Sequence, residues 1–115
     1  MKSEKRIEQE VMLSLSKEGL RVWKNAVGMA YTKDGSPLRY GLGNGSSDLI
    51  GITPKTITQD MVGQTIGVFT AIEMKRSRTG YGATEQQKNF IDTIKKLGGI
   101  AGVAYDVESA IDLVK

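Results

Sequence analysis

Residues 65–74 constrain the fold of this chain more than any other stretch does. Their sequence, TIGVFTAIEM, is rich in β-branched and aromatic residues, which is typical of a β-strand, and Lys75 follows directly. Because successive side chains of a strand point to opposite faces, Glu73 and Lys75 must share one face, and Ile72 and Met74 occupy the other. A lone glutamate–lysine pair of this kind is most often a solvated strand end. The rest of the chain therefore decides what the pair indicates.

Three helices are expected from the spacing of apolar residues. Between residues 3 and 18 these residues recur every three or four positions, with Ser3 as a cap and Gly19 as a stop. A second helix is predicted at residues 84–97, capped by Thr84, and a third at residues 107–114.

Further strands are expected at residues 20–27, 48–53 and 100–105. Residues 28–47 are rich in glycine and predict a long loop or a hairpin around Asp34 and Gly35, residues 54–65 predict a turn with one helical loop, and residues 76–83 predict a basic loop. The order helix, strand, strand, strand, helix, strand, helix predicts an α/β fold. We expect one mixed central sheet flanked by helices on both faces.

Composition narrows the possible chemistry. At 115 residues the chain has the size of one domain, which we expect to span residues 1–115. No apolar run reaches the roughly 18 residues of a membrane span and the start is highly charged, so we expect a cytosolic protein. The chain has no cysteine and no histidine, which excludes disulfides, thiolate and imidazole ligands, and histidine-based catalysis. Any catalysis must use carboxylates and lysine, and the net charge of +3 is only weak support for a polyanionic partner.

Asp48 gives the glutamate–lysine pair its context. It opens an apolar strand directly after a glycine-rich segment, a position that on its own suits a turn or cap residue. Two carboxylates held close together repel each other unless a cation lies between them, and such hard oxygen ligands favour Mg²⁺ or Mn²⁺. Asp48 and Glu73 are the candidate pair. A metal-bound water can attack phosphorus, and Lys75 beside it would orient that water or help to deprotonate it.

These residues belong to an ordered set of motifs. The set comprises Glu8 on the first helix, NAVG at 25–28, YGLGNGSSDL at 40–49, IEMKR at 72–76, TEQQKNF at 84–90 and LGG at 97–99. It resembles the PD-(D/E)xK nuclease superfamily and, more closely, a stand-alone VRR-NUC domain of bacteriophages and bacteria, from about Glu4 to the end of the chain. Ser47 stands where the superfamily's proline would be, and the Val-Arg-Arg signature is represented only by Arg76 and Arg78.

The resemblance implies a restriction-endonuclease-like fold and roles for further residues. Glu8 would be the third carboxylate, with Glu4 as the alternative one turn earlier on the same helix face. The carbonyl of Met74 would be a metal ligand beside Asp48 and Glu73, and Gln87 would bind phosphate or water. Surface positions are the ordinary alternative for a helical glutamate or glutamine.

Basic residues near these motifs are candidates for contacts to DNA phosphates. They are Lys24, Lys33, Arg39, Arg76, Arg78 and Lys88. Tyr31, Tyr40 and Tyr81 could stack on unpaired bases, although loop tyrosines more often pack locally.

The resemblance thus implies a Mg²⁺-dependent, structure-selective DNA endonuclease that acts on branched DNA, especially four-way (Holliday) junctions. Symmetric cutting of two strands requires two active sites, so we expect a C2 homodimer. The family suggests phage or prophage recombination or repair, in the cytosol of the bacterial host. A binding module of the same fold without catalysis is one alternative, and a nuclease acting on flaps, ends or plain duplex is another.

Overall fold

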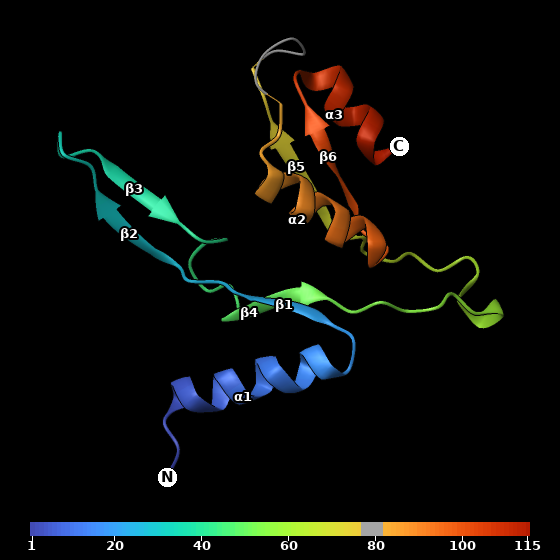
Figure 1. Cartoon of the computed structure of the whole chain (residues 1–115), viewed down its shortest axis with the longest axis horizontal. Coiled ribbons are helices and arrows are strands. Elements are labelled where there is room, and N and C mark those ends of the chain that lie inside the picture. The colour runs from blue at the N-terminus through green and yellow to red at the C-terminus, as the bar shows by residue number, and fades with distance from the viewer. Residues whose placement is uncertain (77–81) are drawn as a thin grey trace. The chain divides into compact units, whose positions relative to one another are not determined.

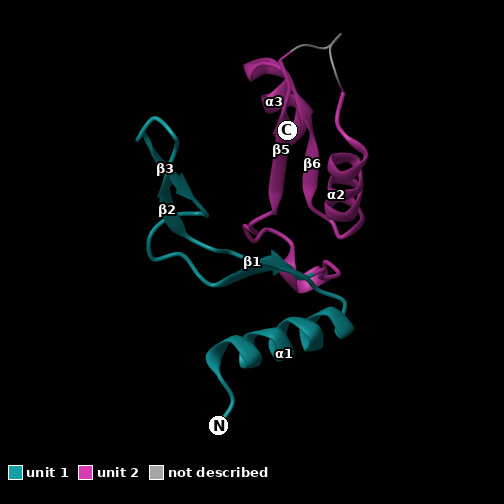
Figure 2. Ribbon diagram, turned by 60° about the vertical axis from the view of Figure 1, so that its left-hand side comes forward, with its two compact units in different colours: residues 1–53 teal, residues 54–115 magenta. Residues whose placement is uncertain are grey.

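The structure is a computed structural model that describes residues 1–76 and 82–115. The chain divides into two compact units, Met1–Thr53 and Pro54–Lys115 (Figure 2), and each is described by itself. The single domain expected over residues 1–115 therefore stays a prediction. None of the described helices is long and apolar enough to cross a membrane.

The first unit begins with helix α1 (Glu4–Lys17), which packs against strand β1 (Arg21–Lys24) (Figure 1). Ser3 caps the helix as expected, because its side chain accepts a hydrogen bond from the backbone N–H of Arg6 at 3.2 Å. β1 pairs antiparallel with β4 (Leu49–Ile52), and Lys24 lies opposite Leu49 in the register. This end of the ladder therefore brings residues 24–25 next to residues 48–49.

Strands β2 (Gly28–Tyr31) and β3 (Pro37–Tyr40) form an antiparallel hairpin, which is one of the two alternatives expected for residues 28–47. In its turn, Asp34 accepts hydrogen bonds from the Thr32 hydroxyl and from the Ser36 backbone N–H. The Thr32 hydroxyl, and then Ser36, lower the pKa of Asp34 to about 2, because both bonds favour the charged carboxylate. The turn thus keeps its charge at any ordinary pH.

The second unit contains a short 3-10 helix η1 (Gln59–Met61), strand β5 (Thr70–Met74), helix α2 (Glu85–Lys96), strand β6 (Ile100–Ala104) and helix α3 (Val107–Val114). β5 and β6 pair in parallel, with Thr70 opposite Ile100 and Met74 opposite Ala104. Parallel strands need a long crossover, and α2 supplies it. Both α2 and α3 pack against β6.

The core of the second unit is centred on Ile94 of α2, whose exposed fraction is 0%. Ala101 and Ala104 of β6 are also buried. Gly102 lets α3 approach β6 closely, because a Cβ there would lie 2.6 Å from a methyl carbon of Leu113. Small residues on β6 therefore allow both helices to pack tightly on this strand.

Ile94→Ala is expected to lower the free energy of unfolding by about 2–5 kcal/mol, since it deletes fully buried methyl groups and leaves a cavity. Ile111→Ala on α3 is the matched control, because Ile111 is 46% exposed. Urea unfolding of both variants measures the difference. Equal losses in the two variants would contradict this assignment of the core.

The helices follow the sequence prediction closely, whereas the sheet does not. The described strands form three separate two-stranded sheets, β1–β4, β2–β3 and β5–β6, in place of one mixed sheet. β5 is also shorter than expected, because residues 65–69 include Gly67, and Ile66 and Val68 are exposed. β1 and β4 are likewise shorter than the expected 20–27 and 48–53, because they cover only residues 21–24 and 49–52.

Candidate active site

Glu73, Lys75 and Gln87, which were predicted to be catalytic, lie in mutual contact in the second unit. The Lys75 ammonium donates a hydrogen bond to Oε1 of Gln87 at 2.9 Å, and Nε2 of Gln87 donates to Oε1 of Glu73 at 2.9 Å. The Lys75 Nζ and the same Glu73 oxygen are 3.5 Å apart. The Lys75 and Glu73 side chains are 19% and 34% exposed, so both are partly shielded and still reachable from solvent.

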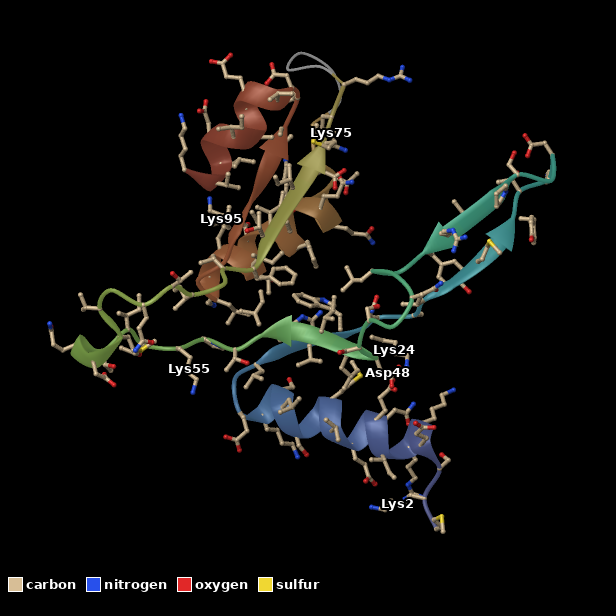
Figure 3. The ribbon with its side chains drawn as sticks, turned by 180° about the vertical axis from the view of Figure 1, so that it is seen from behind. Lys2, Lys24, Asp48, Lys55, Lys75 and Lys95 are labelled. Carbon is tan, nitrogen blue, oxygen red and sulfur yellow. The ribbon has the colours of Figure 1, made fainter. Side chains whose placement is uncertain are left out.

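The strand places Glu73 and Lys75 on one face, as the sequence predicted. Along β5 the half-buried residues are Ala71 and Glu73, and Lys75 continues this alternation directly after the strand. The backbone N–H of Lys75 donates to the carbonyl of Ala104 at 2.9 Å, which extends the contact with β6 past Met74. The base of the Lys75 side chain is therefore held by the backbone of the neighbouring strand. Figure 3 shows Lys75 at the end of this strand.

Gln87 is positioned by the first turn of α2. Its Oε1 accepts the backbone N–H of Thr84 at 2.9 Å, and its own N–H donates to the Thr84 hydroxyl at 3.1 Å, which together form a capping box. The same oxygen also accepts from Lys75. The amide thus has its oxygen fixed by two donors, and this leaves its NH₂ group aimed at Glu73.

Asp48 and Glu8 belong to the first unit and line one pocket there. The pocket is formed by Glu4, Lys5, Glu8, Gln9, Met12, Lys24 and Asp48. Asp48 is exposed and Glu8 is half-buried. Figure 3 shows Lys24 and Asp48 at adjacent ends of β1 and β4.

Lys24 is one of the two lysines that line this pocket, beside Lys5. Its ammonium donates to Oε2 of Glu8 at 2.8 Å. The hydrogen bond with Glu8 raises the pKa of Lys24, and the negative charges of Glu8, Asp48 and Glu4 add to the effect. Sequence reasoning placed Lys24 among the phosphate contacts and did not foresee this ion pair, whose partners are sixteen residues apart.

Asn25 is a further residue of this region to which the sequence analysis gave no role. It is buried, its backbone N–H donates to the Asp48 carbonyl at 2.7 Å, and its side chain bonds to the glycine-rich segment before Asp48. Its place in the NAVG motif at residues 25–28 was the available signal. It could be interpreted only once the pairing of β1 with β4 was known.

The predicted metal ligands fall in both units: Asp48 lies in the first, and Glu73 and Met74 lie in the second. Within either unit, the part of the chain that the structure describes contains no group of three or more acidic side chains arranged to hold a metal ion. The donors that are present are carboxylates, and no histidine or cysteine occurs in the sequence. This donor set fits a hard cation such as Mg²⁺ or Mn²⁺.

The predicted contacts to nucleic acid are mostly exposed. Lys33 lies in the turn of the β2–β3 hairpin, Arg39 on β3, Arg76 directly after Lys75, and Lys88 on α2, all with exposed side chains. Tyr31 and Tyr40 of the hairpin are also exposed. Arg78 and Tyr81 lie outside the described residues.

Comparison with known proteins gives one match. A family model described as the VRR-NUC domain matches residues 2–107, nearly the whole chain. Neither the curated proteins nor the solved structures yielded a match. The matched region includes both the Glu73–Lys75–Gln87 contacts and the Glu8–Lys24–Asp48 pocket.

Proposed function

Because the chain belongs to the VRR-NUC domain family, whose domains are of nuclease type, we propose that it is a metal-dependent endonuclease that hydrolyses phosphodiester bonds in DNA. The contact of Glu73, Lys75 and Gln87 is the observation that carries this proposal. A half-buried carboxylate and an ammonium group, joined by an amide, can bind a cation and stabilise charge on a phosphate without histidine. The restriction-endonuclease-like fold is part of the proposal.

Asp48, Glu73 and the carbonyl of Met74 would hold one Mg²⁺, for which Mn²⁺ substitutes, and Glu8 would be the third carboxylate. When bound, the ion lowers the pKa of a water molecule and offsets negative charge on the phosphate oxygens. The hard oxygen donors named above support this choice of metal.

Lys75 acts on the water and the phosphate, and Gln87 holds it beside Glu73. The Lys75 ammonium stabilises negative charge that develops on the phosphate oxygens and orients the attacking water. Gln87 keeps Lys75 and Glu73 in one arrangement, because its oxygen faces the ammonium and its NH₂ group faces the carboxylate. Such fixed geometry lowers the reorganisation that the reaction needs.

The proposed substrate is branched DNA, above all the four-way junction, cut by a C2 homodimer in phage or prophage recombination or repair in the bacterial cytosol. Exposed basic residues support binding to phosphates: they are Lys33, Arg39, Arg76 and Lys88. Two copies would present two sites to the two strands that must be cut.

Cleavage of a synthetic four-way junction, a flap and a linear duplex of the same sequence tests this function. We expect the junction to be cut with Mg²⁺ or Mn²⁺ and all cutting to stop with EDTA. Light scattering should give the mass of two chains. Binding of the junction without cutting would indicate a non-catalytic module, and cutting of linear duplex alone would overturn the junction assignment.

A further inference from the structure

A single buried side chain ties the glycine-rich segment before Asp48 to the end of β1. Asn25 is 8% exposed, and it is the one buried polar residue in the described part of the chain. A buried side-chain amide lowers the stability of the fold unless its N–H and C=O groups form hydrogen bonds. The partners of Asn25 therefore show what it holds in place.

All the hydrogen bonds of the Asn25 side chain go to residues 42–47. Its Nδ2 donates to the Ser46 hydroxyl at 2.8 Å and to the Ser47 carbonyl at 2.9 Å. Its Oδ1 accepts the backbone N–H of Leu42 at 3.1 Å. Both amide hydrogens and the amide oxygen are thus used, and they clamp the two ends of the segment.

The backbone at and around residues 42–47 fits this arrangement of hydrogen bonds. Gly41 has a φ of +84°, and a Cβ at this position would lie 2.5 Å from the Ala26 carbonyl oxygen. A glycine is therefore needed where the chain passes against the residue that follows Asn25. The Ser46 hydroxyl also donates to the Gly43 carbonyl at 2.7 Å, which braces the middle of the segment.

Asn25 holds the peptide groups on both sides of Asp48. Its side chain binds the carbonyl of Ser47, and its backbone N–H binds the carbonyl of Asp48 at 2.7 Å. Because each peptide group is planar, holding these two carbonyls restrains the φ and ψ angles of Asp48. One residue thus restrains the direction in which the Cα–Cβ bond of Asp48 leaves the backbone.

We propose that Asn25 is a positioning residue for Asp48: by holding both flanking peptide groups, it aims the carboxylate in the direction that metal binding requires. This inference rests on the proposed function, because only that function gives Asp48 a metal ion to bind. It assigns a task to a buried residue that is not among the proposed metal ligands. Residues that hold a metal ligand in its orientation in this way affect metal affinity or activity by about 10–100-fold.

Only an asparagine satisfies all these partners at this position. An aspartate has the same shape, but it cannot donate to the Ser47 carbonyl, and its charge would repel that oxygen. Asn25→Asp therefore breaks the clamp with little change in volume. Asn44→Asp is the matched control, because Asn44 lies exposed in the same segment and receives the same charge.

The experiment measures Mn²⁺ affinity by electron paramagnetic resonance, and kcat and KM on the junction, for wild type, Asn25→Asp, Asn25→Ala and Asn44→Asp. We expect both Asn25 variants to bind Mn²⁺ about 10–100-fold more weakly and to lose kcat, with KM for DNA unchanged. Asn44→Asp should match wild type. Loss of stability alone would reduce the active fraction and leave the Mn²⁺ affinity of the folded protein unchanged.

Hydrogen exchange of the Leu42 amide gives a direct check of the clamp, and it should speed up in both Asn25 variants. If Asn25→Ala does not fold, Asn25→Asp and Ser46→Ala decide, and Ser46→Ala should weaken Mn²⁺ binding less than Asn25→Asp does. Wild-type Mn²⁺ affinity and kcat in folded Asn25→Asp would overturn the inference. The proposed function fails separately, through retained cleavage in Asp48→Asn.

Discussion

Asp48→Asn is expected to lower the rate of junction cleavage by on the order of 10³-fold, which corresponds to about 4 kcal/mol of transition-state stabilisation. The substitution removes the negative charge and keeps the shape of the side chain. Because the Asp48 side chain is exposed and its contact with Asn25 is made by the backbone carbonyl, folding should be unaffected. Single-turnover cleavage beside a thermal melt measures both effects.

The same variant tests whether Asp48 and Glu73 bind one ion. In wild type, a single Mn²⁺ titration should broaden the amide NMR signals of both residues together, and in Asp48→Asn both effects should weaken together. Asp92→Asn, which neutralises an exposed carboxylate on α2, is the control and should behave as wild type. Full cleavage by Asp48→Asn would remove this residue from the metal site and the proposed mechanism with it.

Lys75→Met should also reduce cleavage by on the order of 10³-fold, since it removes the charged donor that we propose acts on the reacting phosphate. The contact between Gln87 and Glu73, and the capping box of Gln87 with Thr84, do not depend on the ammonium group. The variant should therefore stay folded and bind Mn²⁺ with wild-type affinity. Loss of kcat with retained metal binding is the expected signature.

Lys95→Met provides the control for this substitution, because Lys95 is an exposed lysine on α2 (Figure 3). It should cleave at the wild-type rate. A Lys75→Met variant that loses Mn²⁺ binding in parallel with cleavage would show that Lys75 only maintains the site. Unchanged cleavage would exclude any part for Lys75 in the reaction.

Local signals in the sequence predicted the helices well. Ser3 and Thr84 cap α1 and α2 as expected, because a cap depends on residues within one turn of it. The strands were predicted too long, because the length of a strand depends on residues far away in the sequence. The apolar composition of residues 65–74 indicates a strand, but only partner strands determine how much of it pairs, and pairing begins at Thr70.

In the candidate site, too, the sequence predicted the local features and missed the contacts between distant residues. The shared face of Glu73 and Lys75 follows from the two-residue period of a strand, and Gln87 from its position in the family motif. The Glu8–Lys24 pair and the Asn25 clamp join residues sixteen to twenty-two positions apart. No periodicity encodes such contacts, so they become visible only with the fold.

Gln87 serves the helix and the site with one amide oxygen, which accepts from both Thr84 and Lys75. Fraying of the first turn of α2 would therefore remove the contact between Gln87 and Lys75 at the same moment. Heat should inactivate the protein through this local opening before the core around Ile94 melts. The thermal limit of the enzyme is then set by one helix end, and strengthening that end would extend its working range.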